Sequence, residues 1–158
     1  MTGEILASLE YLKLNDSIIR SFWDIGTSFK NVRILHLARC ELKELQGIQA
    51  FLQLEELYVS FNDIDELFDV GFLDHLQVLD LEGNNVNSVE QLYYLKRCPQ
   101  LQEVNFKSNP VQKEAAYYQR IKDNVQNLEV LDDEVVTHDF FEQKEKEARK
   151  MNLREEKN

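Results

Sequence analysis

The sequence predicts an α/β solenoid, a coiled chain in which short strands alternate with short helical segments. Two observations indicate this fold class. A pattern of apolar residues recurs five times, starting near residues 9, 32, 54, 76 and 101, which is a period of about 22 residues. A different motif, with the character of a terminal cap, follows the last copy over residues 110–136.

Each copy places leucine or another apolar residue at the same positions and then a polar residue that is usually asparagine. The copies are Leu9-Leu12-Leu14-Ser17-Ile19, Val32-Leu35-Leu37-Cys40-Leu42, Leu54-Leu57-Val59-Asn62-Ile64, Leu76-Leu79-Leu81-Asn84-Val86 and Leu101-Val104-Phe106-Asn109-Val111. This is the pattern of a leucine-rich repeat. We therefore expect a right-handed array of about five 22-residue repeats with a parallel sheet on its concave face and a C-terminal repeat cap.

The residues that follow each strand have separate roles in such a repeat. The asparagine side chain is expected to bond backbone groups of neighbouring coils, which forms a buried ladder. Cys40 and Ser17 replace asparagine, so we interpret them as members of this ladder, the alternative at Cys40 being a reactive thiol. The next apolar segments should pack on the convex side with their aromatic residues in the core. These segments are Phe22 with Trp23 and residues 48–52, 68–73 and 92–95.

The cap should close the C-terminal end of the array. It contains a predicted helix over residues 113–124, after which the chain adds a last strand-like rung. The side chains expected to cover the final coil are Tyr117 or Tyr118, Ile121, Leu128 and Leu131. The leucine-rich-repeat domain is thus predicted to span residues 1–136, with its cap at 110–136.

The two ends of the sequence differ from the array between them. Residues 137–158 are predicted as a charged tail, helical or frayed, and the alternative is the start of a coiled coil through Phe141, Ala148 and Met151. No cap sequence precedes Leu9. We therefore expect the sequence to be a shortened form of a longer protein.

The excess acid lies in the centre of the chain, whose formal net charge is −11. Between Lys43 and Lys96 there are eleven acidic residues and no lysine or arginine. A negative surface repels phosphate backbones and anionic lipids, and it attracts a basic protein surface. No apolar run approaches the roughly 20 residues of a membrane-spanning helix. We therefore expect a cytoplasmic protein with a basic protein partner, and neither nucleic acid nor a membrane as ligand.

Strand alternation decides which side chains face the open concave sheet. Three positions of each repeat are expected there, so that basic, aromatic and acidic zones follow one another along the array. This composition suits recognition of a protein partner; the alternative is a solvated sheet face. The predicted protein-binding residues are His36, Arg39, Tyr58, Phe61, Asp80, Glu82, Asn105 and Lys107.

The same geometry predicts no catalytic, cofactor-binding or metal-binding residues. Asp80 and Glu82 are carboxylates on one strand face, but no pocket-forming insertion or nucleophile accompanies them. His36 is expected to point to solvent and Cys40 into the ladder, so the two should not converge on a metal. Residues 62–66 lack the central glycine and the final glutamate of a calcium loop. We therefore expect a protein that is not an enzyme and needs no cofactor.

Several residues outside the repeat consensus point to a particular family. They are Asp-Ile-Gly-Thr-Ser at 24–28, Leu-His-Leu-Ala-Arg-Cys at 35–40, Leu-Tyr-Val-Ser-Phe-Asn at 57–62, Leu-Asp-Leu-Glu-Gly-Asn at 79–84, Tyr94-Leu95 and Cys98-Pro99. Over residues 9–135 the sequence resembles the ciliary leucine-rich-repeat family required for outer dynein arm assembly. The resemblance implies a non-catalytic adaptor that helps to mature outer-arm dynein in the cytoplasm and hands it to intraflagellar transport for delivery to cilia or flagella. It implies an outer-arm dynein or intraflagellar transport subunit as the partner, and it supplies no binding residues.

Other roles in the same repeat class stay open. A phosphatase-regulating subunit would bind its catalytic subunit on the concave face of a longer array. An axonemal dynein light chain would bind a motor head and remain in the axoneme. A splicing-type partner of an RNA-binding protein would carry the same cap. In each case we expect the chain to be a monomer.

Overall fold

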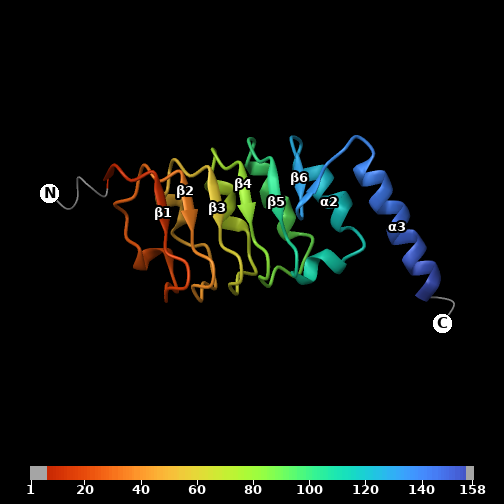
Figure 1. Cartoon of the computed structure of the whole chain (residues 1–158), viewed down its shortest axis with the longest axis horizontal. Helices are drawn as coiled ribbons and strands as arrows, with labels where there is room; N and C mark the ends of the chain where they lie inside the picture. Colours follow the sequence, from red (N-terminus) through yellow and green to blue (C-terminus); the bar gives the residue numbers. More distant parts are fainter. Residues whose placement is uncertain (1–6, 156–158) are drawn as a thin grey trace.

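The computed structural model describes residues 7–155. The chain coils so that successive coils add their strands to a single sheet (Figure 1). Its strands lie side by side in sequence order, and each is only two or three residues long. They are β1 (Tyr11–Lys13), β2 (Ile34–His36), β3 (Glu56–Tyr58), β4 (Val78–Asp80), β5 (Glu103–Asn105), β6 (Val130–Leu131) and β7 (Glu134–Val135). All neighbouring pairs are parallel except β6 and β7, which form an antiparallel hairpin. The predicted leucine-rich-repeat solenoid is confirmed.

The register of the strands aligns the repeats position by position. The central residues of the three-residue strands, followed by Leu131 of β6, pair in register to form a single row. This row consists of Leu12, which is partly buried, and the buried residues Leu35, Leu57, Leu79, Val104 and Leu131. Because side chains alternate along a strand, the residues on either side of each central one must face away from the core.

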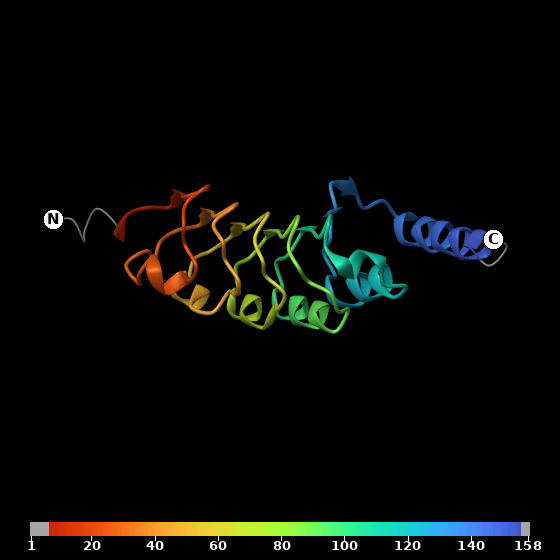
Figure 2. The same cartoon turned by 90° about the horizontal axis from the view of Figure 1, so that it is seen from below.

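Short 3₁₀ helices return the chain along the convex side, opposite the strands (Figure 2). They are η1 (Phe22–Asp24), η2 (Ile48–Ala50), η3 (Phe68–Phe72), η4 (Gln91–Arg97) and η5 (Pro110–Lys113). A 3₁₀ helix suits this place because it rises about 2.0 Å per residue and covers the width of a repeat in few residues. Each of these helices buries one or two apolar side chains.

One expectation about the convex side is wrong. Phe22 is buried, but Trp23, Phe68 and Phe72 are 56%, 45% and 48% exposed. The core beneath η3 is filled by Val70 and by leucines that flank the helix. A 3₁₀ turn brings every third residue to the same face, so the remaining aromatic rings are left on the outside.

The predicted asparagine ladder is present. Asn62 donates from Nδ2 to the carbonyl oxygens of Leu37 (2.9 Å) and Val59 (2.8 Å), and its Oδ1 accepts from the N–H groups of Cys40 (2.9 Å) and Leu42 (3.0 Å). Asn84 and Asn109 repeat this arrangement. Cys40 occupies the ladder position of its own repeat, where its buried Sγ donates to the carbonyl oxygen of Leu14 (3.2 Å). Its place is therefore structural.

The position just before each ladder residue has a left-handed backbone conformation. The backbone angle φ of the residue at this position lies between 55° and 67° in all five repeats. This turn lets the chain leave the strand and point the next side chain back into the core. The left-handed row consists of Asp16, Arg39, Phe61, Gly83 and Ser108.

The C-terminal cap covers the last repeat as expected. Helix α2 (Tyr117–Asn124) begins later than predicted, after η5, and it buries Tyr117 and Ile121 completely. The hydroxyl of Tyr117 donates to Asp132 (2.9 Å), whose other carboxylate oxygen accepts the N–H of Phe106 (2.7 Å). Asp132 therefore ties the cap helix to the last full strand of the array.

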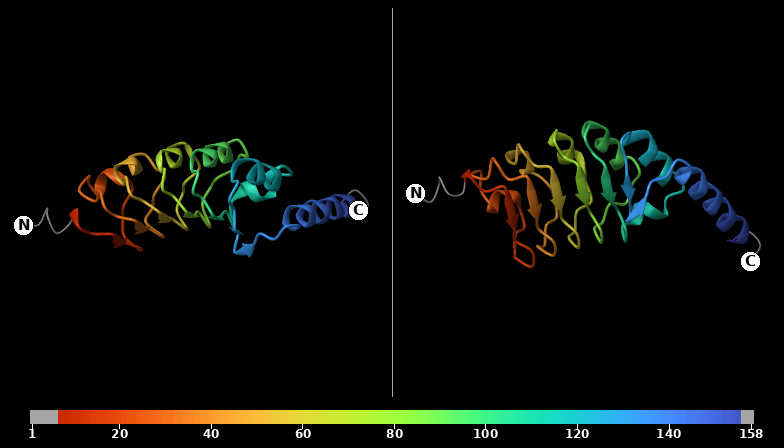
Figure 3. Two further views of the ribbon diagram at one scale, coloured as in Figure 1. Left: turned by 90° about the horizontal axis from the view of Figure 1, so that it is seen from above. Right: turned by 45° about the horizontal axis from the view of Figure 1, so that its top comes forward.

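Helix α3 (Phe140–Glu155) extends from the cap beyond the array (Figure 3). Its first turn is anchored, because Phe140 is 5% exposed and packs near Tyr118, and Lys144 pairs with Glu134 at 2.7 Å. Its later residues, such as Met151, are exposed. The charged tail is thus a helix that docks at one end. Among the described residues, no helix combines the length and the apolar character that crossing a membrane would require.

Candidate protein-binding surface

Two columns of side chains cross the open face of the sheet, one on each side of the buried central row. The first column consists of Tyr11, Ile34, Glu56, Val78 and Glu103. The second consists of Lys13, His36, Tyr58, Asp80 and Asn105. The predicted binding residues include four of the second column, His36, Tyr58, Asp80 and Asn105. The same alternation, applied one residue before each buried centre, also gives the first column.

Aromatic rings join the first three strands of this face. The imidazole of His36 stacks on the ring of Tyr58, with centroids 4.3 Å apart and planes 8° apart. Tyr11 lies on the other side of His36 at 5.4 Å. Burial and the neighbouring Lys13 lower the pKa of His36, so the imidazole is neutral at neutral pH. The three rings form a preformed apolar platform, which we call the aromatic row.

Phe61 and Arg39 occupy the left-handed row beside this platform. Phe61 is 50% exposed and its ring rests against Gly83 of the next repeat. The guanidinium of Arg39 pairs with Asp16 of the preceding repeat, with Nη2 to Oδ2 at 3.0 Å. The ion pair lowers the pKa of Asp16. The expected zone of free positive charge at Arg39 is therefore neutralised within the chain.

Three carboxylates lie beside the aromatic row, on β3, β4 and β5. Tyr58 donates its hydroxyl to Glu56 Oε2 at 2.7 Å. Burial raises the pKa of Asp80, and burial together with Asp133, Asp80 and Glu56 raises the pKa of Glu103. These groups are therefore close enough to repel one another. We call Glu56, Asp80 and Glu103 the acidic cluster; within residues 7–155 none of them forms an ion pair.

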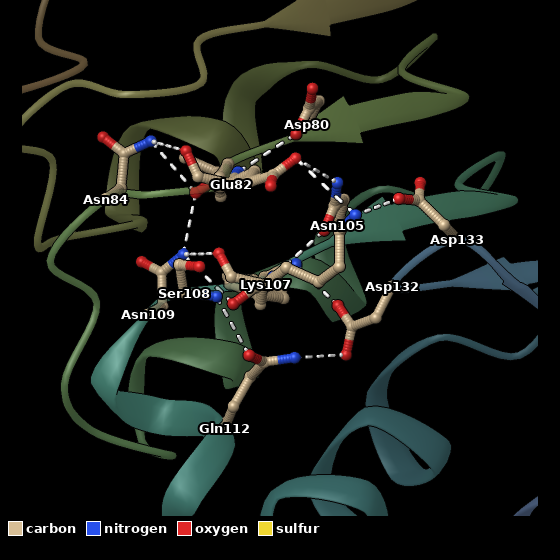
Figure 4. A network of polar contacts seen from close by, with 12 residues as sticks. Asp80, Glu82, Asn84, Asn105, Lys107, Ser108, Asn109, Gln112, Asp132 and Asp133 are labelled. Atoms are coloured by element: carbon tan, nitrogen blue, oxygen red, sulfur yellow. Dashed lines mark hydrogen bonds and ion pairs between the residues drawn. The ribbon is translucent and has the colours of Figure 1, made fainter.

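The C-terminal end of the face is a closed polar network (Figure 4). Lys107 pairs with Asp133 and lies 3.7 Å from Glu82 Oε2. Asp133 comes from the β6–β7 hairpin; the sequence predicted the strand-like rung at Leu131, which is β6, but not the return strand β7. Both carboxylates raise the pKa of Lys107, which remains charged. Lys107 is thus shared between Glu82 and Asp133, and these three side chains together keep one negative charge beside the acidic cluster.

Asn105 is not the exposed contact residue that alternation predicts. It is 7% exposed, and its Oδ1 accepts the N–H of Lys107 at 3.0 Å. Asp80 accepts the N–H of Glu82 in the same way, also at 3.0 Å. Asn105 therefore shapes the turn that carries Lys107.

Neither a metal-binding cluster nor an exposed cysteine is found among the described residues. In the span 7–155 no group of three or more His, Cys, Asp or Glu side chains is arranged to hold a metal ion. Burial raises the pKa of the Cys98 thiol to about 12, so it stays protonated. Cys40 and Cys98 are both buried and unpaired with each other. The open face presents aromatic rings and carboxylates along the strands.

Comparisons with known proteins place the chain in a family. No family model matches it. It is 48% identical to the Mus musculus protein named Leucine-rich repeat-containing protein 56 over 109 residues, which are 69% of this chain and 20% of that protein. The Homo sapiens protein of the same name is 37% identical over 148 residues, 86% of this chain and 27% of the relative. The chain belongs to the leucine-rich-repeat family.

Two further matches of the leucine-rich-repeat chain are more distant. An Arabidopsis thaliana protein named Protein phosphatase 1 regulatory inhibitor subunit PPP1R7 homolog is 29% identical over 99 residues, 62% of the chain and 30% of the relative. The crystal structure of the Drosophila melanogaster SNF/U2A' complex contains a chain that superposes with a TM-score of 0.73 at 18% identity, over 96% of this chain and 98% of that one. The second match concerns the fold alone. The leucine-rich-repeat chain spans between a fifth and a third of the curated relatives named here.

Proposed function

We propose that this chain is the repeat region of a non-catalytic protein-binding adaptor. The adaptor assists the assembly of outer-arm dynein and its delivery to cilia or flagella by intraflagellar transport. The residues at 24–28, 35–40 and 57–62 support this process through the family resemblance given above. The relatives named Leucine-rich repeat-containing protein 56 support the broader statement that the chain is a leucine-rich-repeat module for protein interaction.

The observation that carries the proposal is the open sheet face itself. An aromatic row and an unpaired acidic cluster lie side by side on it, and Phe61 is half exposed at its edge. A few residues carry most of the binding energy of an interface, and tyrosine is enriched among them. A charge cluster selects the partner and speeds its approach. Repeat arrays commonly bind through such a concave surface.

The chemistry of this face specifies the partner. A lysine or arginine that reaches Glu56, Asp80 and Glu103 would neutralise carboxylates that repel one another. Apolar side chains next to it would cover Tyr58 and Phe61. We therefore propose a partner with a basic, partly apolar surface, which is an outer-arm dynein or intraflagellar transport subunit. The adaptor would act as a monomer in the cytoplasm and the cilium, without a cofactor, nucleic acid or membrane as ligand.

Regulation of a phosphatase is the second candidate. The observation in its favour is the Arabidopsis thaliana relative whose name is that of a phosphatase regulatory subunit. Its identity to this chain is 29%, against 48% for the mouse relative. We therefore rank it below the dynein adaptor. In both candidate functions the open sheet face binds the partner, which is a phosphatase catalytic subunit in one and an outer-arm dynein or intraflagellar transport subunit in the other.

Affinity capture from ciliated-cell extract tests the proposal. The wild-type chain and the Phe61→Ala/Arg39→Ala variant are immobilised, and bound proteins are quantified by mass spectrometry at low and moderate salt. Outer-arm dynein chains or intraflagellar transport subunits should bind the wild type and decrease at least about tenfold with the variant. A Glu114→Gln variant, changed at an exposed residue outside the sheet face, should bind like the wild type.

Two outcomes would reject the proposed function. Recovery of a phosphatase catalytic subunit in place of ciliary proteins would select the second candidate. Recovery of ciliary proteins in equal amounts by the Phe61→Ala/Arg39→Ala variant would remove the sheet face as their binding site. Thermal unfolding of each variant shows beforehand that the array is intact.

A further inference from the structure

The convex side carries a connected group of exposed aromatic rings. Phe68 lies 5.4 Å from Phe72 within η3 and 5.5 Å from Tyr94 of η4, and Tyr94 lies 6.0 Å from Tyr93, all between ring centroids and all edge to face. Phe68, Phe72 and Tyr93 are 45%, 48% and 57% exposed. We call these four residues the convex aromatic patch. Exposed apolar groups of this kind mark interaction sites more often than isolated surface residues do.

The three exposed rings are not part of the core, whereas Tyr94 is partly buried and packs against it. Val70 anchors η3 and Leu92 with Leu95 anchors η4, all with no exposed area. The rings are instead held against one another and against Arg97, whose guanidinium lies 6.0 Å from the centroid of Phe68. The stem of Arg97 crosses the surface of Gly71, where a Cβ atom would lie 2.8 Å from Cδ of the arginine. The patch is therefore a fixed surface rather than a set of loose side chains.

A hollow continues the convex aromatic patch toward the cap. It lies between η4 and α2 and is lined by Val89, Glu90, Tyr93, Tyr94, Arg120 and Asp123. The two tyrosines form a wall shared by the patch and the hollow. An apolar side chain that enters the hollow would therefore bury tyrosine surface and leave its own polar backbone at the rim.

Unpaired acids border the other side of the patch. Burial, followed by the charges of Glu44 and Glu66, raises the pKa of Asp69, so these three carboxylates lie close together beside η3. In the part of the chain from residue 7 to 155, none of the three takes part in an ion pair. The field at this border is negative, and a partner that brings positive charge there would be attracted.

We propose that the convex aromatic patch docks an amphipathic, basic segment of a second protein. Its apolar side chains would cover Phe68 and Tyr93 and enter the hollow, and its lysines or arginines would face Glu44, Glu66 and Asp69. Charge selects this occupant. A second copy of the chain carries a net charge of −11 and would be repelled, as would the anionic head groups of a membrane.

The short helices η3 and η4, which carry this patch, lie on the opposite side of the array from the strands that carry the aromatic row and the acidic cluster (Figure 3). The short helices and the strands form the two faces of one coil, so a protein on one face leaves the other face free. The chain would then hold two basic partners at once. This inference does not depend on the identity of the partner of the concave face.

A synthetic peptide tests the convex site. The probe is a fluorescein-labelled helix former with leucine on one face and lysine on the other, and the control peptide has the same composition in scrambled order. Binding is measured by anisotropy and located by amide chemical shifts of the ¹⁵N-labelled chain. The largest shifts should fall in residues 66–72 and 89–97, and the scrambled peptide should bind at least about tenfold more weakly.

Paired variants decide the outcome. Phe68→Ala/Tyr93→Ala should raise the Kd of the peptide at least about tenfold. Glu44→Gln/Glu66→Gln should weaken binding mainly at low salt. The control variants Glu114→Gln and Phe61→Ala should leave the Kd unchanged. Tyr93→Ala alone changes only an exposed ring and provides a variant that keeps the fold. Shifts concentrated on the strands, or an unchanged Kd in Phe68→Ala/Tyr93→Ala and in Tyr93→Ala, would overturn the proposal. So would sedimentation of the wild type as a dimer that Tyr93→Ala dissociates, or preferential binding to anionic vesicles.

Discussion

The ring of Phe61 occupies the space that a side chain at Gly83 would need. A Cβ atom on Gly83 would lie 2.8 Å from Cε1 of Phe61, which is closer than real Cβ contacts. Gly83 also has φ +67°, a conformation that side chains disfavour. The glycine of one repeat therefore makes room for the exposed phenylalanine of the repeat before it.

Gly83→Ala should destabilise the array by about 1–2 kcal/mol, because the methyl group meets both the left-handed backbone and the Phe61 ring. Urea unfolding measures the loss. In a Phe61→Ala background the same change should cost less, since only the backbone strain remains. Equal costs in both backgrounds would show that the ring and the glycine are not coupled.

Asn62→Ala should lower the free energy of unfolding by about 3 kcal/mol, because the substitution leaves buried backbone donors and acceptors of two repeats without partners. Asn85→Ala is the matched control, since Asn85 is exposed, and it should cost less than about 0.5 kcal/mol. Urea denaturation of the two variants checks the difference. A small loss for Asn62→Ala would contradict the ladder as a principal stabilising element.

The strand and ladder positions could be predicted because the same residue type recurs at the same position of successive repeats. Leu35, Leu57 and Leu79 are the buried strand residues of their repeats. The asparagine side chain can donate to and accept from the backbone of two neighbouring coils at once. The exposed rings of Phe68 and Tyr93 did not follow, because a five- or seven-residue 3₁₀ helix is too short to give a clear apolar period.

The candidate surface was predictable only in part for a similar reason. Alternation places His36, Tyr58 and Asp80 on the sheet face, but it contains no information about neighbours from other segments. The β6–β7 hairpin brings Asp133 to Lys107, and Arg39 turns to Asp16. The docking of α3 through Phe140 was hidden in the same way, inside a run of charged residues.

The acidic cluster should make stability fall as the pH rises. The pKa values of Asp80 and Glu103 are raised in the folded chain, so folding favours their protonated forms. That contribution is present at low pH and is lost as the pH rises through the raised values. Asp80→Asn/Glu103→Gln should therefore raise the Tm at pH 7, with a difference that shrinks toward pH 4. A lower Tm at pH 7 would show that the carboxylates stabilise the array.

Phe140→Ala should release α3 without unfolding the array. Phe140 is almost fully buried and contacts Tyr118 and Phe141, whereas the later part of α3 is exposed. Amide hydrogen exchange in residues 140–150 should become at least about tenfold faster, and exchange in the strands should not change. Met151→Ala, at an exposed position of the same helix, should change neither. Equal exchange in Phe140→Ala and the wild type would contradict the anchoring contact.

Photo-cross-linking at position 61 tests the central claim most directly, because it identifies the protein that touches the sheet face. The chain carrying Phe61→p-benzoylphenylalanine is irradiated in ciliated-cell extract beside a chain carrying the same group at Glu114. We predict covalent adducts to an outer-arm dynein or intraflagellar transport subunit from position 61 and none from position 114. Adducts only to other proteins, or equal yields from both positions, would contradict the account.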